Sequence, residues 1–186
     1  RALEIMPFLD ESAALLDVHS SNTNISTPFI ICEPHSFEIV KFLPFPIISY
    51  GWDVIQAGGT DYYMNHNGKI GICVECGYHL DPDAPRRAIE SIMIFLSLFG
   101  AIVKRPSEKS VDQKIIHAYQ IHLTKTDFTP FREFADFESL EEGEIIGTDG
   151  NDYILAPSNA CIIFPHRRER PSEEAFVLGK RKFFNE

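Results

Sequence analysis

Two side chains that could do chemistry together stand at the ends of two apolar segments. His19 closes the apolar segment 15–19, and Glu75 lies near the end of the apolar segment 70–76. An imidazole can bind a divalent metal ion, and a carboxylate can accept a proton. Open α/β sheets place such groups in the crevice beyond the carboxyl ends of their strands. We therefore expect His19 and Glu75 to face one crevice.

The segments that carry these residues have the composition of buried strands. Residues 14–18 are nearly all apolar, which favours a central parallel strand covered on both faces over an edge strand. Gly71 and Gly77 permit a close approach of the backbone around the expected site. Thr60 is placed to cap a short helix that begins at residue 61.

The clearest helix is expected over residues 84–99. Asp83 is a suitable N-cap, Pro85 fits the first turn, and Gly100 follows the end. Apolar side chains recur at helical spacing along this segment, so the helix should pack on the sheet. These side chains are Ala88, Ile89, Ile92, Met93, Ile94, Phe95, Leu96 and Phe99.

The pattern changes after residue 104. Residues 106–110 have the composition of a linker, and short candidate strands follow, separated by Gly, Pro and Asp. We expect strands at 115–123, 143–148, 153–156, 160–164 and 175–178. The sequence therefore predicts two domains. Residues 1–104 form an α/β unit with a mostly parallel sheet and flanking helices, and residues 105–186 form a small antiparallel β module.

The order of these features resembles the succinylglutamate desuccinylase/aspartoacylase family of zinc-dependent deacylases, relatives of the zinc carboxypeptidases. The resemblance rests on the Asp-x-His motif at 17–19, the Glu-x-Gly motif at 75–77, the long helix that follows and the small β module. It extends from Leu15 to about Gly179. It implies a carboxypeptidase-like fold in which residues 1–104 are the C-terminal part of the zinc-hydrolase domain.

The resemblance also implies a hydrolytic zinc ion, Zn²⁺. His19 would be its third protein ligand, and Asp17 would orient a neighbouring group or cap the strand. Glu75 would be the general base, which takes a proton from water and returns it to the leaving amine. The implied substrate is an N-acylated amino acid or similar small molecule. The alternative is a non-catalytic module of the same fold that binds a small molecule or a protein. The same ligands also suit other divalent ions.

The family places a His-x-x-Glu pair upstream of the third ligand. Only 18 residues precede His19, and the chain begins with Arg. We therefore expect it to be the C-terminal portion of a longer protein whose upstream part carries the pair. His35 and Glu38 have the right spacing, but they follow His19, and an amphipathic helical turn should carry both to solvent. We do not assign them to the metal.

Three further features allow more than one interpretation. Cys73 and Cys76 point to opposite faces of a strand, so burial is favoured over a redox pair or a zinc clip. His79 could contact substrate or lie in an exposed loop. The basic segment 166–170 could hold a substrate carboxylate, because guanidinium groups bind carboxylates bidentately, although a solvated turn is the simpler interpretation.

The composition limits the classes of molecule that the chain can bind. A formal net charge of −10 argues against nucleic acids and anionic membrane surfaces as partners, and no apolar run has the length of a membrane span. With 44% apolar residues the chain can form a core. Its four cysteines lack the dense spacing of a secreted disulfide scaffold, so we expect a reducing, cytoplasmic compartment. The expected partner is a small N-acyl substrate, and a homo-oligomer is compatible with the sequence.

Overall fold

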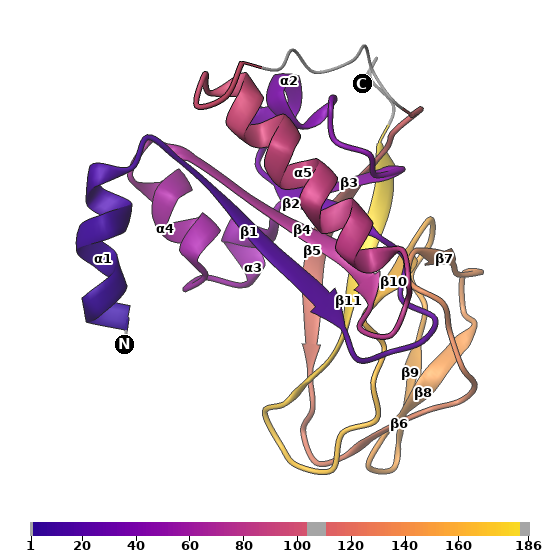
Figure 1. Ribbon diagram of the computed structural model, residues 1–186. Helices are drawn as coiled ribbons and strands as arrows, with labels where there is room; N and C mark the ends of the chain where they lie inside the picture. The colour runs from indigo at the N-terminus through magenta and orange to yellow at the C-terminus, as the bar shows by residue number, and fades with distance from the viewer. Residues whose placement is uncertain (1, 104–110, 183–186) are drawn as a thin grey trace.

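A mixed eight-stranded sheet runs through the computed structural model, which describes residues 2–103 and 111–182 (Figure 1). Its strands, in spatial order, are β1 (Ala14–Ser21), β4 (Ile70–Tyr78), β2 (Phe29–Cys32), β3 (Ile47–Tyr50), β5 (Lys114–Leu123), β11 (Glu174–Lys182), β10 (Cys161–Ile163) and β7 (Glu138–Ser139). A second, antiparallel sheet contains β6 (Phe128–Pro130), β8 (Ile145–Asp149) and β9 (Asp152–Leu155).

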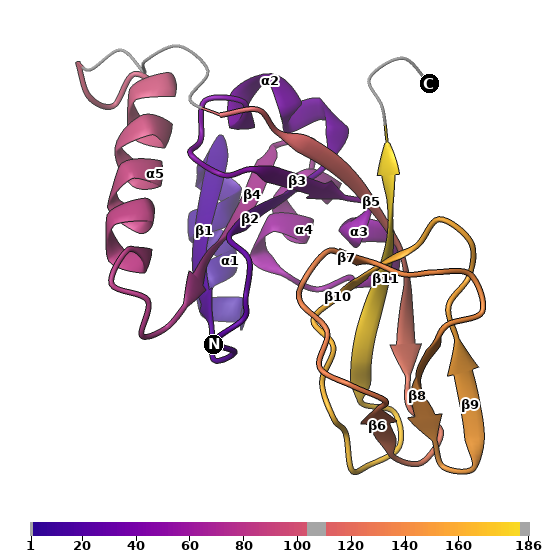
Figure 2. The same ribbon diagram turned by 90° about the vertical axis from the view of Figure 1, so that its right-hand side faces the viewer.

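Helices cover both faces of the first half of the large sheet (Figure 2). Helix α5 lies on one face, and α3 and α4 lie on the other. The helical segments are α1 (Ala2–Glu11), η1 (Pro34–Ser36), α2 (Phe37–Val40), α3 (Trp52–Ile55), α4 (Thr60–His66) and α5 (Ala84–Leu98). The pairs β1–β4, β2–β3 and β3–β5 are parallel. The expected α/β class, with a largely parallel sheet and a small antiparallel sheet, is confirmed.

Strand β4 carries its side chains alternately to the two helical layers. Ile72, Val74 and Cys76 join the core under α5, and all three are buried. On the opposite face Gly71 lies against α4, where an added Cβ would stand 2.2 Å from the backbone oxygen of Asp61. Only glycine allows this approach. The close backbone approach predicted at Gly71 therefore allows α4 to pack against the strand that carries Glu75.

Strand β1 departs from its predicted central position. In the described part of the chain it pairs with β4 alone, and its residues are half-buried or exposed. The prediction of a strand covered on both faces is therefore wrong for this structure. Apolar composition shows that a strand can be buried, but it does not say whether a second neighbouring strand lies in the same chain.

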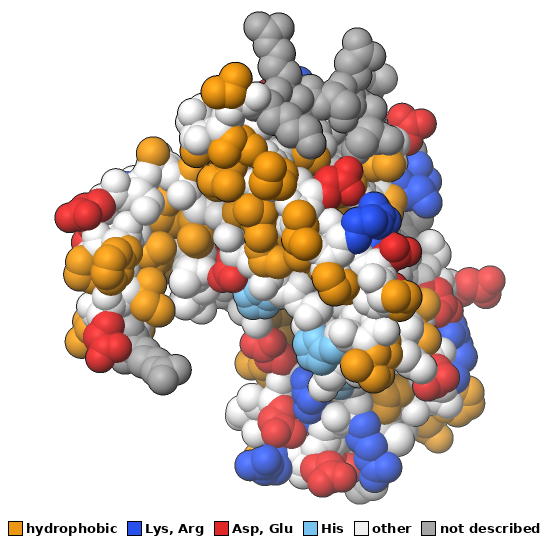
Figure 3. Space-filling model, viewed as in Figure 1, with side chains coloured by type: hydrophobic (Ala, Val, Ile, Leu, Met, Phe, Trp, Pro, Cys, Tyr) orange, Lys and Arg blue, Asp and Glu red, His pale blue; other side chains and the backbone are white. Residues whose placement is uncertain are grey.

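Helix α5 begins at the predicted residue and ends at Leu98, with Asp83 as N-cap and Gly100 in the left-handed region beyond the end. Ala84, Ala88 and Phe95 pack toward the sheet, as expected. Other apolar side chains predicted to pack are exposed, and Figure 3 shows apolar side chains gathered over this helix. They are Ile89, Ile92, Met93 and Phe99, between 38% and 63% exposed.

The start of α4 is one residue earlier than predicted. Gly59 is its N-cap and Thr60 is its first residue, so Thr60 is not the cap. The Thr60 hydroxyl instead donates to Asp17, on the neighbouring strand β1. A local capping rule could not find this bond, because its partner lies 43 residues away in the sequence.

Strand β5 joins the two predicted domains in one sheet, since it pairs with β3 on one side and with β11 on the other. The expected strands of the second half all form, with ends shifted by one or two residues, except that β11 extends further to Lys182. Strands β6 and β7 were not predicted. The expected linker at 106–110 lies outside the described residues, and the division at residue 104 stays a prediction. None of the described helices is long and apolar enough to cross a lipid bilayer.

Candidate active site

His19 and Glu75 are placed side by side by the pairing of two parallel strands. They are direct partners in the register of β1 and β4. The Nδ1 atom of His19 lies 3.9 Å from Oε1 of Glu75, which is too far for a hydrogen bond. The structure therefore brings together the two residues that the sequence singled out. Their chemical roles stay a prediction.

Asp17 occupies the other side of the imidazole ring. It precedes His19 by two residues, so both side chains leave the same face of β1. Its Oδ1 atom lies 3.0 Å from Nε2 of His19, and its other oxygen accepts the Thr60 hydroxyl at 2.5 Å. With a proton on Nε2, the lone pair of Nδ1 is directed away from Asp17, on the side where Glu75 lies.

Glu75 is a buried carboxylate with an unsatisfied oxygen. Its side chain is 12% exposed, and Oε2 has no hydrogen-bond partner. Burial raises the pKa of Glu75, and the opposing charge of His19 does not cancel this effect. An unpartnered buried carboxylate costs free energy, so its retention points to a function or to a missing partner. A raised pKa suits a group that must exchange protons near neutral pH.

The charges of Asp17 and His19 are coupled. The hydrogen bond that His19 donates to Asp17 raises the pKa of His19 and lowers the pKa of Asp17. The side chain of His19 is half-exposed, so solvent weakens this coupling. The ion pair stabilises the fold at pH below the unfolded pKa of histidine, about 6.5, and above the lowered pKa of Asp17. Its contribution is lost as pH rises through the raised pKa of His19 and as pH falls through the lowered pKa of Asp17.

Asp17→Asn provides a direct check of this coupling. The amide cannot offer a negative charge to Nε2, so we expect the pKa of His19 to fall and the imidazole to lose its proton at lower pH. The measurement is an NMR titration of the His19 ring in both proteins. Thr60→Val is the control, since it removes the other bond of Asp17 but keeps the charge. An unchanged His19 titration in Asp17→Asn would show that Asp17 does not hold the ring.

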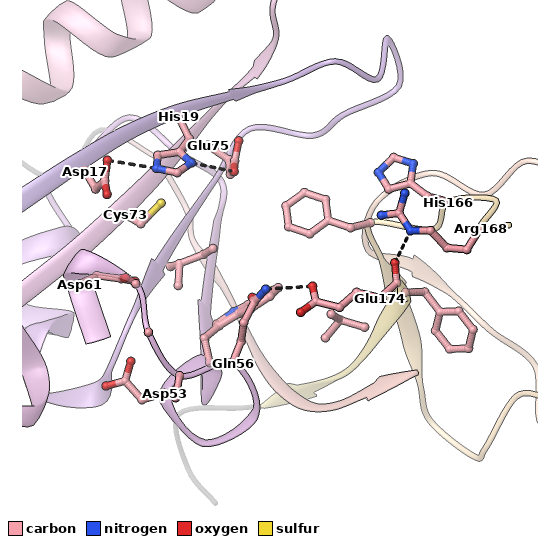
Figure 4. Close-up of a pocket in the computed structure, with 18 residues that line it drawn as sticks. Asp17, His19, Asp53, Gln56, Asp61, Cys73, Glu75, His166, Arg168 and Glu174 are labelled. Atoms are coloured by element: carbon pink, nitrogen blue, oxygen red, sulfur yellow. Dashed lines mark hydrogen bonds and ion pairs between the residues drawn. The ribbon is translucent and has the colours of Figure 1, made fainter. Parts of the chain in front are cut away.

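A cavity of about 540 Å³ contains the side chains of His19 and Glu75 (Figure 4). Its near wall comes from β1, β4 and the segment between α3 and α4, and its far wall comes from β11 and the loop before it. Trp52, Gln56 and Glu174 contribute to the cavity, and Gln56 Nε2 donates to Glu174 Oε2 at 2.9 Å across it. The other polar or charged lining side chains are Asp17, His19, Asp53, Asp61, Cys73, Glu75, His166 and Arg168.

The remaining sequence candidates have clear positions. His35 and Glu38 are exposed and lie outside the cavity lining, as expected. His79 also lies outside it, and its Nδ1 atom is 2.7 Å from the hydroxyl of Ser20. Cys73 and Cys76 are buried free thiols, so the preference for burial is confirmed, and burial raises the pKa of Cys76 to about 11. Cys73 also lines the cavity.

The basic segment 166–170 is not simply a solvated turn. His166 and Arg168 line the cavity opposite His19 and Glu75, whereas Arg167 and Arg170 are exposed outside it (Figure 4). Sequence reasoning identified the segment but not which of its residues face inward. The signal that could have found them is the alternation of Phe164, His166 and Arg168, which all line the cavity.

Solved structures of known proteins share this fold. The succinylglutamate desuccinylase of Vibrio cholerae superposes with a TM-score of 0.76 at 13% identity, and that of Vibrio parahaemolyticus with 0.74 at 15% identity. Each comparison covers 99% of this chain and 60% of the other. The chain has the succinylglutamate desuccinylase/aspartoacylase fold. An aspartoacylase family protein of Mesorhizobium loti gives a TM-score of 0.67 at 17% identity, over 98% of this chain and 68% of its own.

The resemblance found in the sequence is thereby confirmed at the level of the fold. No protein-family model matches the sequence, and no curated protein matches it. The chain spans 60% of the length of the two Vibrio structures, so 40% of each has no counterpart in it. The comparisons therefore show the fold alone, and the chemistry of His19 and Glu75 must be argued from the residues themselves.

Proposed function

We propose that this chain is the C-terminal part of a zinc-dependent hydrolase of the deacylase type, which cleaves the amide bond of an N-acylated amino acid or similar small molecule. One observation carries the proposal. His19 and Glu75 meet in one cavity, with a carboxylate on the far nitrogen of the imidazole and an unsatisfied oxygen on the glutamate. The similarity of this fold to the solved succinylglutamate desuccinylase structures supports the proposal.

The described residues can supply one ligand of a zinc site, which is His19. Metal-binding histidines typically give their other ring nitrogen to a carboxylate, as His19 does to Asp17. His19 would therefore hold the metal through Nδ1. Among the described residues no group of three His, Cys, Asp or Glu side chains is arranged to hold an ion. The other ligands must come from elsewhere, and we assign them to a segment upstream of this chain.

Two features of the fold support such a segment. The outer edge of β1 has no partner strand within the described residues, and apolar side chains of the adjacent α5 are exposed. Unpaired strand edges and contiguous apolar patches are features that proteins usually cover. A further strand beside β1 would extend the sheet and cover this edge.

Glu75 performs the proton transfers in this proposal. Zinc, when bound, supplies a Lewis acid that polarises the amide carbonyl and makes water more acidic. The Glu75 carboxylate accepts a proton from the attacking water and delivers it to the nitrogen of the leaving amine. Asp17 keeps the His19 ring oriented during both steps.

The test compares this chain with the longer protein. The 186 residues alone should carry no stoichiometric zinc and hydrolyse no amide, because one imidazole does not hold the ion against water. The protein with its upstream segment should bind zinc and hydrolyse N-acylated amino acids, and a chelator should abolish the activity. Metal analysis and an amine-release assay measure both. If the longer protein neither binds zinc nor hydrolyses any such amide, the non-catalytic binding module is the better account.

A further inference from the structure

The far wall of the cavity begins at a residue with an unfavourable backbone conformation. Phe164 lines the cavity and has a φ of 51°, in the left-handed region. Bulky side chains rarely adopt this region, and the following Pro165 favours an extended backbone at the residue before it. Such a conformation persists only where the surrounding structure holds it. A specific contact must therefore hold Phe164.

The carboxylate of Asp136 provides this contact. Its Oδ1 atom accepts the backbone amide of Phe164 at 2.8 Å, and its Oδ2 atom accepts the amide of Thr27 in a longer bond of 3.4 Å. Burial raises the pKa of Asp136, and the two amide bonds oppose this shift because they favour the charged form. Thr27 lies in the loop after β1, 109 residues before Asp136. One carboxylate thus joins the loop that follows His19 to the far wall.

Four aromatic side chains pack beside these bonds, and we call them the aromatic cluster: Phe29, Trp52, Phe137 and Phe164. The ring centroid of Phe29 lies 4.7 Å from that of Phe137 and 5.5 Å from that of Phe164. The rings of Trp52 and Phe164 are 6.1 Å apart. Phe29 is fully buried and is the direct partner of Glu75 in the register of β2 and β4. The aromatic cluster therefore connects the strand beside Glu75 with the far wall.

Two rings of the aromatic cluster are carried by left-handed residues. Phe137 has a φ of 63°, and its amide donates to the Ile162 oxygen at 2.7 Å. Phe164 is held by Asp136 in the same way. If Phe164 relaxed to an extended backbone, its ring would leave Phe29, and the wall that continues through His166 would move with it. The bond from Phe164 to Asp136 therefore determines where this wall lies.

We propose that Asp136 is a positioning residue, which holds Phe164 in its left-handed conformation and thereby keeps the far wall in place opposite His19 and Glu75. This inference deepens the proposed function and rests on it. Asp136 does not line the cavity, so it acts through Phe164 and does not touch the substrate. The far wall contacts the part of the substrate away from the reacting amide. Its displacement should therefore weaken substrate binding more than it slows the chemical steps.

Amide hydrogen exchange in the 186-residue chain tests the contact without turnover. Asp136→Ala removes both acceptor oxygens, so the Phe164 amide should exchange about 10- to 100-fold faster, the range expected for a hydrogen bond to a charged group. The amides that pair β1 with β4 should exchange as in the parent, which separates a local change from general destabilisation. Asp127→Ala is the matched control, because it removes an exposed carboxylate of the same β module and should leave Phe164 unchanged.

Steady-state kinetics of the longer protein provide the second readout. Asp136→Ala should raise KM about 10-fold, the smallest effect expected when a pocket loses one apolar contact, while kcat changes less. A merely structural role would reduce the amount of folded enzyme, and so the turnover per total protein, without raising KM. Asp136→Asn keeps an oxygen for Phe164 but loses the charge, so both effects should be smaller.

The outcomes separate this inference from the proposed function. An unchanged exchange rate at Phe164 in Asp136→Ala overturns the inference, and so does a loss of turnover at unchanged KM. If Asp136→Ala does not fold, Asp136→Asn decides, and a parental exchange rate at Phe164 in it overturns the inference. Faster exchange at Phe164, combined with a longer protein that hydrolyses no amide, leaves the positioning contact standing and removes the hydrolase.

Discussion

Glu75→Gln in the longer protein should lower turnover by about 10²- to 10⁴-fold, the usual contribution of a positioned general base. The amide preserves the size of the side chain but cannot accept a proton from water. It also fits the local structure, because Oε2 of Glu75 is buried without a partner and burial already disfavours its charged form. Zinc content should be unchanged, since Glu75 is not assigned as a ligand. Steady-state kinetics and metal analysis provide the two readouts.

The matched control for this variant is Asp61→Asn. Asp61 lines the same cavity and carries the same charge, but it lies on α4 and not beside His19 in the β1–β4 register. Its loss should change turnover far less than the loss of Glu75. A Glu75→Gln enzyme that hydrolyses its substrate at close to the parental rate would show that Glu75 is not the base.

His19→Ala should remove both zinc and turnover from the longer protein. Removing a residue that hydrogen-bonds to a metal ligand typically weakens metal binding by 10- to 100-fold. Removing the ligand itself should therefore weaken metal binding by more than about 100-fold. The side chain is half-exposed on an edge strand, so the fold should tolerate the substitution. Competition with a chelator of known affinity measures the loss.

His35→Ala serves as the control for His19→Ala. His35 is exposed, lies outside the cavity and belongs to the His-x-x-Glu sequence that we did not assign to the metal. Its removal should leave the zinc affinity unchanged. If His35→Ala loses zinc and His19→Ala keeps it, the assignment of the ligand is reversed.

The sequence predicted the parts of the site that depend on local pattern and strand register. Apolar runs ending in His19 and Glu75 indicated two strands, and parallel pairing places those residues next to one another. Periodicity also located α5, but it could not tell which apolar side chains the sheet covers, and Ile92 and Phe99 were assigned to the wrong environment. Within the described residues β1 is an edge strand and not the expected central one, because apolar composition does not show whether a second neighbouring strand is present.

The contacts that complete the cavity could not be predicted, because they join residues far apart in the chain. Gln56 and Glu174 are 118 residues apart, and their bond spans the two walls. The inward direction of Arg168 depends on its pairing with Phe128 and on the backbone of Glu174. These partners lie far from Arg168 in the sequence, so the basic segment alone favoured a solvated turn, and only the alternation of residues 164, 166 and 168 hinted at an inward face.

The central claim is that His19 and Glu75 belong to one zinc-dependent site and have different roles in it. It is tested most directly by measuring zinc stoichiometry and turnover on the same samples of the parent, Glu75→Gln and His19→Ala forms of the longer protein. The account predicts that Glu75→Gln keeps its zinc and loses its turnover, whereas His19→Ala loses both. Parental turnover in Glu75→Gln, or full zinc content in His19→Ala, would contradict it.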